Sequence, residues 1–421
     1  MSGQPYPVKD SRKEIVFIRH AESQANLDGV WNGRSDGPLS QTGMNSLESL
    51  GRRLSKWDFD AVISSPLVRA RQTAEAFSSE VHIDEDIVEI DLGAWEGMHF
   101  TDVQQLHGEE LQRAIETRTV PMGSSGESLE QVGKRAISAV DRLFDQMSAN
   151  ERVAVVTHAG FLQAVLHRHL AGDGRRVHGF ASNTGLTRIV QQFGRPRLAS
   201  FNDTGHLGPR PAVVDHHLSE GHKVVTLIRH GRTLANLEGR WQGRGDWDLD
   251  DLGHRQAEAL GDWYGRHATV YSSPLKRAAS TAAHLALNGV TPVDDFMEIH
   301  MGEWEGMTTV EIAEKWADEM DRIYREGIDL PRGTTGETWA QLTQRFSDAI
   351  ARLEHPDEGL TVAVAHGGAI RAYVSSLTNT TDTHSESLFT PANTSVTHIA
   401  LTDRGPEILD YSVATHLESL E

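Results

Sequence analysis

The sequence contains an arginine–histidine pair directly after a β-rich run, and a second such pair about 210 positions further on. These pairs are Arg19-His20 and Arg229-His230. A neutral imidazole with one nitrogen held by a hydrogen bond presents the other nitrogen as a nucleophile. A guanidinium binds phosphate oxygens through two parallel hydrogen bonds. The pairs predict phosphoryl transfer through a phosphohistidine, with His20 and His230 as nucleophiles and the arginines as phosphate ligands.

Each half also contains three further residues that such a reaction needs. A second arginine would bind the phosphate, and a glutamic acid would protonate the leaving alkoxide and then activate water. A second histidine would donate to the transferring phosphoryl group. In that order, the candidates are Arg69, Glu89 and His158 in the first half, and Arg277, Glu298 and His366 in the second.

An internal duplication connects the two sets. Matching segments occur in the same order in both halves: IRHAESQANL and IRHGRTLANL, SSPLVRARQTA and SSPLKRAASTA, EIDLGAWEGM and EIHMGEWEGM, and THAG and AHGG. A repeat of this length is a duplicated domain rather than a solenoid unit. The sequence predicts one domain at 11–207 and another at 222–418. The segment 208–221 has no counterpart and contains Pro, Gly and polar residues, so it is predicted to be a linker.

Short β-rich runs alternate with amphipathic stretches in each half. Runs such as EIVFI at 14–18 and VAVVT at 153–157 suit buried parallel strands. Helices of the first half are predicted at 40–56, 66–78, 128–149 and 160–171, the second of them starting at Ser65-Pro66. The pattern predicts α/β domains with helices on both faces of a sheet. In such sheets ligands bind at the carboxyl ends of the strands, where the candidate residues are expected to gather.

These motifs resemble those of a known family, the phosphoglycerate mutase-like members of the histidine phosphatase superfamily. IRHAES and IRHGRT resemble its RHG signature, and SSPL, G.WEG, GES or GET, and THAG or AHGG resemble its later motifs in the expected order. The resemblance covers nearly all of both halves. It implies two Rossmann-like domains of three layers (helix, sheet, helix) with a mostly parallel sheet, and no metal or cofactor. It assigns the same roles to the residues above and adds Asn26 and Asn236 to the phosphate pocket.

Two spacings bear on the type of reaction. His158 follows Glu89 by 69 positions, and His366 follows Glu298 by 68. Mutases of the family have a long insertion in this interval, so the resemblance favours hydrolysis. The leading hypothesis is a metal-independent phosphatase that acts on small phosphomonoesters at two sites. The alternatives are one catalytic half with a regulatory or scaffold half, and a phosphoryl-transferring mutase.

The halves differ next to both catalytic histidines. Ala21 and Ala159 of the first half stand where the second half has Gly231 and Gly367. Because alanine is disfavoured at positive φ, these positions are not expected to need that conformation. The two methyl groups predict that the halves differ in substrate preference or rate.

Other arginines could bind a second anionic group of the substrate or form ion pairs with acids of the protein. They are Arg34, Arg113, Arg118, Arg244, Arg322, Arg325 and Arg332. The tryptophans beside the motifs, at 31, 95, 241 and 304, are predicted to pack rather than to bind ligand.

The bulk composition excludes several classes of function. The 421 residues include no cysteine, which excludes thiolate catalysis and disulfides. The net charge of −20 argues against nucleic acid and anionic membranes as partners. No run approaches the about 18 apolar residues of a membrane helix, and the polar N-terminus does not resemble a secretory signal. We therefore expect a cytoplasmic protein whose partner is a small phosphorylated metabolite. The oligomeric state stays open.

Overall fold

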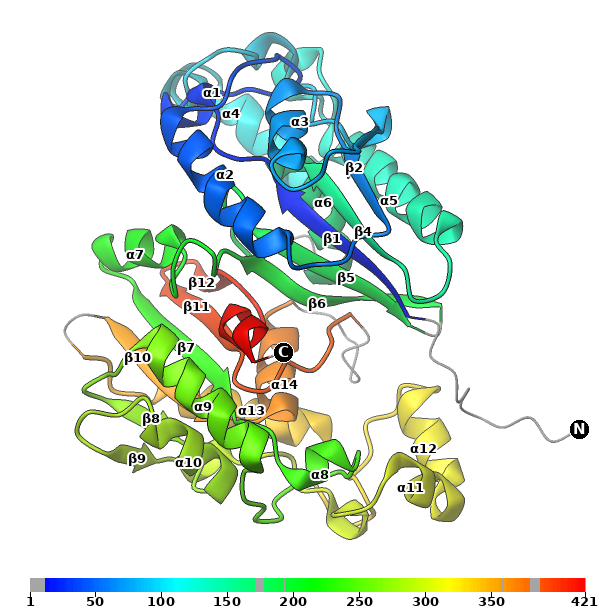
Figure 1. Ribbon diagram of the computed structural model, residues 1–421, viewed down its shortest axis with the longest axis vertical. Coiled ribbons are helices and arrows are strands. Elements are labelled where there is room, and N and C mark those ends of the chain that lie inside the picture. The colour runs from blue at the N-terminus through cyan, green and yellow to red at the C-terminus, as the bar shows by residue number, and fades with distance from the viewer. Residues whose placement is uncertain (1–11, 171–177, 193, 357–358, 379–386, 421) are drawn as a thin grey trace, which may run out of the picture. The chain divides into compact units, whose positions relative to one another are not determined.

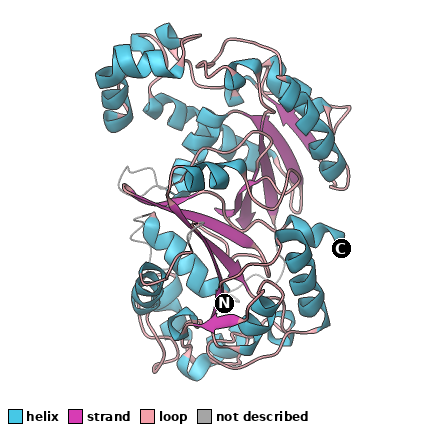
Figure 2. Cartoon of the chain, turned by 90° about the vertical axis from the view of Figure 1, so that its left-hand side faces the viewer, coloured by secondary structure: helices cyan, strands magenta, loops and turns pink. Residues whose placement is uncertain are grey.

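The computed structural model describes residues 12–170, 178–192, 194–356, 359–378 and 387–420. The chain divides into two compact units, Met1–His169 with Phe180–Leu207 and Leu170–Gly179 with Gly208–Glu421. In each unit helices lie on both faces of a central sheet (Figures 1 and 2). This confirms the predicted α/β class of two three-layer domains. The limits 11–207 and 222–418 stay a prediction.

The first unit has a six-stranded sheet in the order β3-β2-β4-β1-β5-β6. Its strands are β1 (Lys13–Arg19), β2 (Ala61–Ser64), β3 (His82–Ile83), β4 (Arg152–Thr157), β5 (Leu186–Gln192) and β6 (Arg195–Asp203). The first four are parallel, and β5 and β6 add an antiparallel edge. Since β1 and β4 pair in register up to Arg19 and Thr157, the residues that follow them, His20 and His158, emerge side by side.

The second unit repeats this topology in the order β12-β11-β7-β10-β8-β9. Its strands are β7 (Lys223–Arg229), β8 (Val270–Ser272), β9 (Val290–Pro292), β10 (Leu360–Ala365), β11 (Val396–Thr402) and β12 (Gly405–Ile408). The pairing of β10 with β7 ends at Ala365 and Arg229. His230 and His366 therefore emerge side by side, as His20 and His158 do in the first unit. The antiparallel strands at the edge of each sheet were not predicted from the sequence.

Helices cover both faces of each sheet. The first unit has α1 (Gln24–Leu27), α2 (Gln41–Leu54), α3 (Val68–Glu75), α4 (Phe100–Thr117), α5 (Leu129–Gln146) and α6 (Ala159–Leu170). The second has α7 (Ala212–Ser219), α8 (Leu234–Leu237), α9 (Asp251–Tyr264), α10 (Lys276–Ala283), α11 (Thr309–Lys315), α12 (Ala317–Tyr324), α13 (Trp339–Ala351) and α14 (Gly367–Leu377). No helix in these described ranges is long and apolar enough to cross a membrane.

Each core forms where alternate strand residues meet a helix. In the first unit Val16, Ile18 and Val156 pack with Leu50 of α2 and Ala70 of α3. The opposite face of β1 meets α6, where the rings of Phe17 and Phe161 lie 6.5 Å apart. The same packing recurs in the second unit, with Leu260 of α9 and Ala278 of α10 on one face.

One predicted helix boundary is wrong. The helix expected to start at Ser65-Pro66 is α3, which begins at Val68 after Leu67, and no side chain caps it. Ser65 is instead fully buried and its hydroxyl contacts His158. A serine before a proline resembles a helix cap in sequence, but here its hydroxyl contacts the histidine that follows the neighbouring strand β4.

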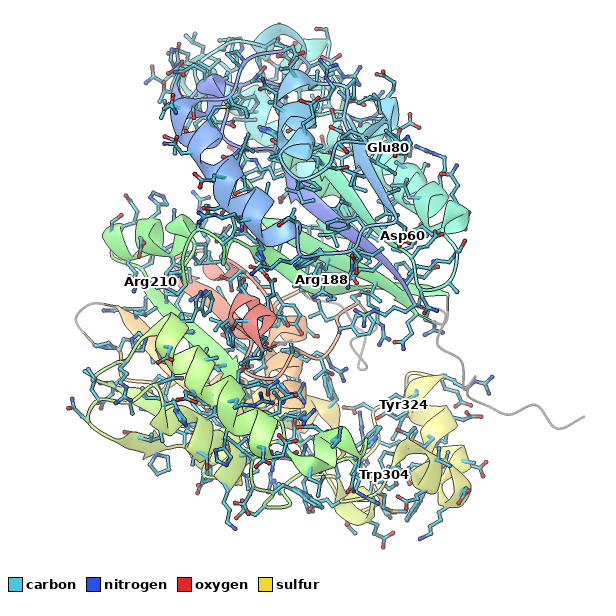
Figure 3. All side chains as sticks on the ribbon, viewed as in Figure 1. Asp60, Glu80, Arg188, Arg210, Trp304 and Tyr324 are labelled. Carbon is cyan, nitrogen blue, oxygen red and sulfur yellow. The ribbon has the colours of Figure 1, made fainter. Side chains whose placement is uncertain are left out.

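The units differ most between the WEG segment and the GES or GET segment. In the first unit this stretch is one helix, α4, with a non-helical residue at His107. In the second unit it is two helices, α11 and α12, which pack on Trp304 through Ile312 and Ile323. Figure 3 labels Trp304 together with Tyr324, the last residue of α12. The full burial of Trp95 and Trp304 agrees with the predicted packing role.

The two first strands are stabilised in different ways. Glu14 on β1 is almost fully buried and accepts hydrogen bonds from Arg188 at 2.5 Å and Arg152 at 3.1 Å. Arg188, labelled in Figure 3, lies on β5. At the matching position of β7 the second unit has Val224, which packs with Val214 of α7. Part of the predicted linker 208–221 is therefore packed structure.

We predict that Glu14→Gln destabilises the first unit by about 2 kcal/mol, because a buried charge-assisted pair is lost. Burial alone would raise the pKa of Glu14, but the charges of Arg188, Arg152 and Arg12 outweigh it and lower the pKa. The ionised carboxylate therefore stabilises the folded protein fully at pH values above 4.5, the ordinary pKa of glutamic acid. This stabilisation is lost as the pH falls through the lowered pKa of Glu14. Urea unfolding at several pH values measures this.

The control is Glu48→Gln, which alters an exposed pair with Arg52 at 4.0 Å and should change the free energy of unfolding little. A Glu14→Gln chain as stable as the unmodified chain at pH 7 would contradict the prediction.

Candidate active sites

The predicted nucleophile of the first unit is a buried histidine with a defined tautomer. His20 follows β1 and is 3 % exposed. Its Nδ1 lies 2.7 Å from the carbonyl oxygen of Ala21, and since a carbonyl can only accept, Nδ1 must carry the proton. The lone pair is thereby left on Nε2, to which the Nε of Arg69 donates at 3.3 Å. The imidazole nitrogen that could attack phosphorus therefore faces an arginine.

The charge state of His20 also suits a nucleophile. Burial, and then the positive charges of Arg69 and Arg19, hold its pKa well below the ordinary value of 6.5, against a smaller opposite effect of the Ala21 carbonyl. The imidazole is consequently neutral at physiological pH, and its lone pair is not blocked by a proton.

Two buried arginines flank this histidine. The fully buried side chain of Arg69 donates to the carbonyls of Gly33 at 2.7 Å and Ser35 at 2.9 Å. Arg19 donates through NH1 to the carbonyl of Ala181 at 2.7 Å, while its buried Nε has no partner in the described part of the chain. Burial lowers the pKa of Arg19 to about 10, so the guanidinium stays charged at neutral pH. A phosphate oxygen would satisfy the remaining donor.

The second histidine offers a further donor. The rings of His158 and His20 lie 5.1 Å apart, and His158 Nε2 lies 2.7 Å from the hydroxyl of Ser65. That hydroxyl accepts from the backbone N–H of Leu67, so its own proton can go to Nε2. The proton of the neutral ring then lies on Nδ1, which is buried and has no partner among the described residues. This atom is suited to a phosphate oxygen.

The candidate acid is held at the start of α6. Glu89 is 7 % exposed, and its carboxylate accepts from the backbone N–H groups of Gly160 at 3.0 Å and Phe161 at 3.1 Å. A Cβ at Gly160 would lie only 2.4 Å from Glu89 Oε1, so only glycine allows the carboxylate to approach this closely. The charge of Glu89 acts on both Arg19 and Arg69. The five candidates therefore share one site.

The second unit repeats the arrangement atom by atom. His230 Nδ1 lies 2.7 Å from the carbonyl of Gly231, and Arg277 Nε donates to His230 Nε2 at 3.2 Å. The rings of His230 and His366 lie 5.1 Å apart, with His366 Nε2 at 2.8 Å from the hydroxyl of Ser273. The atoms without a partner among the described residues are again an arginine Nε and a histidine Nδ1, of Arg229 and His366.

Burial and nearby charges have the same effects there. Burial lowers the pKa of Arg229 to about 10, and burial followed by the charges of Arg277 and Arg229 holds the pKa of His230 well below 6.5. Glu298 accepts from the N–H of Gly368 at 2.8 Å and from its neighbour Ile299 at 2.9 Å. Glu89 likewise accepts from its neighbour Ile90 at 2.9 Å, but among the described residues Glu298 has no counterpart of the bond from Phe161.

Several positioning residues had no assigned role in the sequence prediction. Asn183 donates through its amide to the carbonyl of His20 at 2.9 Å and to Asn26 Oδ1 at 3.4 Å. Asn393 makes the equivalent bonds to His230 and Asn236. The two predicted pocket asparagines are thus tied to the nucleophile segments. The repeated NT dipeptide at 183–184 and 393–394 was the available signal.

A partly buried ion pair holds the backbone next to each candidate acid. Arg135 pairs with Glu127 of the GES segment at 2.8 Å and donates to the carbonyl of Val88 at 2.8 Å. Arg345 and Glu337 repeat this pair in the second unit at 2.9 Å. The GES and GET segments therefore fix the backbone that carries Glu89 and Glu298. Their arginine partners stand at matching positions of the duplication but outside the recognised motifs.

Several of the other arginines are engaged by acids of the chain. Arg34 pairs with Glu127 at 3.2 Å and Arg244 with Glu337 at 3.0 Å. Arg325 and Arg332 likewise form ion pairs within their own segment. Among the residues that the structure describes, no group of three histidine, aspartate or glutamate side chains is placed to hold a metal ion.

The alanine–glycine differences do not reflect backbone strain. Neither Gly231 nor Gly367 has a positive φ, which confirms the expectation from Ala21 and Ala159. A Cβ at Gly367 would instead lie 2.4 Å from Thr390 Cγ2 and 3.1 Å from Arg229 Nε. Glycine there leaves room for Thr390 beside Arg229, the candidate phosphate ligand.

Comparison with known families decides the assignment. A sequence model of the histidine phosphatase superfamily (branch 1) matches residues 15–204 and again residues 225–414. The chain belongs to this superfamily. Each match contains one complete set of candidate residues, so the predicted duplication is a tandem of two histidine phosphatase domains.

Curated relatives match about one half of the chain. A metal-independent phosphoserine phosphatase of Arabidopsis thaliana is 33% identical over 204 residues, which is 47% of this chain and 84% of the relative. Phosphoserine phosphatase 1 of Hydrogenobacter thermophilus is 31% identical over 46% of this chain and 94% of its own length. Adenosylcobalamin/alpha-ribazole phosphatase of Escherichia coli is 30% identical over 45% of this chain and 97% of its own length. The tandem histidine phosphatase is accordingly a phosphoric monoester hydrolase.

We predict that neither His20 nor His230 titrates near pH 6.5, the range of an ordinary histidine, because burial and two guanidiniums oppose protonation. The ¹⁵N chemical shifts of the imidazoles, in protein labelled selectively at histidine, measure this. The Nδ1 of both rings should report the protonated nitrogen of a neutral tautomer from pH 8 down to pH 6. A transition of either ring near pH 6.5, assigned with His20→Ala and His230→Ala, would contradict the prediction.

We also predict that Gly160→Ala slows turnover at the first site, because the new methyl group displaces the Glu89 carboxylate. In a His230→Ala background kcat should fall about tenfold or more, as expected for a misplaced general acid. The matched control is Gly133→Ala on α5, where a Cβ meets nothing within 4 Å. Equal kcat values for the two glycine variants would refute this account of Gly160.

Proposed function

We propose that the protein hydrolyses small phosphomonoesters at two sites, one in each domain, without a metal ion and through a phosphohistidine intermediate. One observation carries this proposal. In both units a neutral histidine Nε2, fixed by a hydrogen bond from its Nδ1 to a carbonyl, faces an arginine, beside two buried donors that no described residue satisfies. The buried donors match the oxygens of a phosphoryl group.

These positions support the following reaction. His20 Nε2 attacks phosphorus, the P–N bond forms, and the bond from phosphorus to the leaving oxygen breaks. The charges of Arg19 and Arg69 and the Nδ1–H of His158 offset the charge on the equatorial oxygens. Glu89 in its protonated form gives its proton to the leaving alkoxide and, once ionised, takes a proton from water; the hydroxide then forms a bond to phosphorus, the P–N bond breaks, and phosphate leaves His20. His230, Arg229, Arg277, His366 and Glu298 act in the same way in the second unit.

Relatives are named for phosphoserine and for α-ribazole phosphate, so both esters belong in the substrate panel. A non-catalytic half is disfavoured because both units keep every bond around the nucleophile at nearly the same length. Mutase activity is disfavoured by the short interval between the acid and the second histidine in both halves.

We predict that His20→Ala and His230→Ala each retain hydrolysis, whereas the double variant loses it by about a thousandfold or more. Release of phosphate from 4-nitrophenyl phosphate, phosphoserine and α-ribazole phosphate in the presence of a chelator measures this. When the reaction with a ³²P-labelled substrate is quenched without acid, each single variant should retain ³²P in a linkage that is stable to alkali and labile to acid.

The control is His82→Ala, which removes an exposed histidine on β3 and should leave all rates unchanged. Complete loss of activity in one single variant would support the alternative of one catalytic half. Loss of activity on addition of the chelator would contradict the metal-independent mechanism.

A further inference from the structure

The second site has a cation that the first site lacks. Arg371 stands five positions after His366, where the first half has Gln163 five positions after His158. Arg371 follows Gly367 by four residues on α14, so both lie on the same helix face about one turn, or ~5.4 Å, apart. A Cβ at Gly367 would lie 3.1 Å from Arg229 Nε, so this face leads to the phosphate-binding arginine.

The side chain of Arg371 is held in place without being neutralised. Its guanidinium lies over the Trp339 ring at 4.9 Å, and its NH1 donates to the Thr390 hydroxyl at 3.1 Å. Thr390 is the residue that Gly367 accommodates. In the described part of the chain Arg371 forms no ion pair with a carboxylate, and its buried Nε has no hydrogen-bond partner. The stacked arginine therefore keeps a donor for a ligand.

Electrostatics indicate that Arg371 and Arg229 share one neighbourhood. Burial raises the pKa of Tyr411, and the charges of both arginines oppose that rise. Tyr411 donates to the carbonyl of Phe389, next to Thr390. The charges of the phosphate-binding arginine and of the stacked arginine therefore both act on one buried hydroxyl.

The first unit has a different set at the same positions. Gln163 is a neutral amide, with a buried oxygen that has no partner among the described residues, where the second unit has the charged guanidinium of Arg371. Leu129 begins α5 where Trp339 begins α13, so the stacking partner is also missing. Phe180, whose side chain is 52 % exposed, stands where the second unit has Thr390. At these three positions the first unit therefore has no charged side chain, and two of the three side chains are apolar.

We propose that Arg371 binds a carboxylate on the leaving group of the second site's substrate, and that the first site prefers phosphomonoesters without a second anionic group. The inference rests on the proposed function of both sites. A guanidinium takes a carboxylate through two parallel hydrogen bonds, and its stacking on Trp339 limits the entropy lost on binding. In the first unit the matching positions hold a neutral amide and an aromatic ring, which carry no positive charge to compensate that of a carboxylate.

The test compares two esters that differ by one carboxylate, O-phosphoserine and O-phosphoethanolamine. His20→Ala isolates the second site and His230→Ala isolates the first. We expect the ratio of kcat/KM, phosphoserine over phosphoethanolamine, to be larger at the second site. Arg371→Gln in the His20→Ala chain should lower that ratio about 10- to 100-fold, mainly through KM, since a charge-assisted bond to substrate is lost.

Matched variants separate this role from a general effect of charge or folding. Arg404→Gln removes the same charge from the β11–β12 turn, at the end of the sheet away from the site, and should not change the ratio. Arg371→Lys should keep part of the preference, because the charge remains but the paired donors do not. Gln163→Arg in the His230→Ala chain should raise the ratio of the first site.

The outcomes distinguish the inference from the proposed function. If neither single-site chain hydrolyses 4-nitrophenyl phosphate, the proposed function fails and this inference fails with it. If both hydrolyse that ester but Arg371→Gln leaves the ratio unchanged, only the role of Arg371 is overturned. Equal ratios at the two unmodified sites would overturn the proposed division of substrates.

Discussion

Burial of two guanidiniums around a neutral imidazole is the constraint on which each domain depends. Burial of the Arg19 and Arg69 guanidiniums would be strongly unfavourable in free energy if no hydrogen-bond acceptors replaced water. The chain supplies them as backbone carbonyls, from Ala181 and from the loop that contains Gly33 and Ser35, and adds the charge of Glu89 nearby. Burial lowers both pKa values but leaves the arginines charged at neutral pH, while the histidine between them loses its proton. The same environment therefore produces both charged guanidiniums and a free lone pair.

This constraint accounts for much of the fold around the site. The parallel pairing of β1 with β4 places the two histidines side by side, and the segment 31–34 presents the carbonyls of Asn32 and Gly33 to Arg69. At the start of α6 the helix N–H groups hold Glu89, a favourable place for a carboxylate. Gly160 permits this contact because any side chain would collide with the carboxylate. Conformation and charge are thus fixed by the same few bonds.

The sequence predicted the α/β class, the duplication and the gathering of the candidate residues, because each depends on local patterns or on repeated motifs. It did not reveal the antiparallel edge strands, whose pairing depends on contacts distant in sequence. The role of Ser65 was also hidden, since a serine before proline looks like a helix cap until the second histidine is seen beside it. Arg135 has an ordinary local context, and the repeated NT dipeptide that contains Asn183 does not by itself indicate a role. Only the three-dimensional arrangement connects them to Glu89 and His20.

Duplication provides an internal comparison that one domain could not. Bonds that the two units share, such as His Nδ1 to carbonyl and arginine to Nε2, have remained within about 0.1 Å while the surrounding surface changed. Where the units differ, the change affects features that do not touch phosphorus. Glu14 with its arginines is replaced by Val224 under α7, and Gln163 by Arg371 on Trp339. The first replacement concerns stability, and we propose that the second faces the leaving group. The shared bonds are therefore those on which the proposed phosphoryl transfer depends, and the differences lie where we propose that the two domains select different esters.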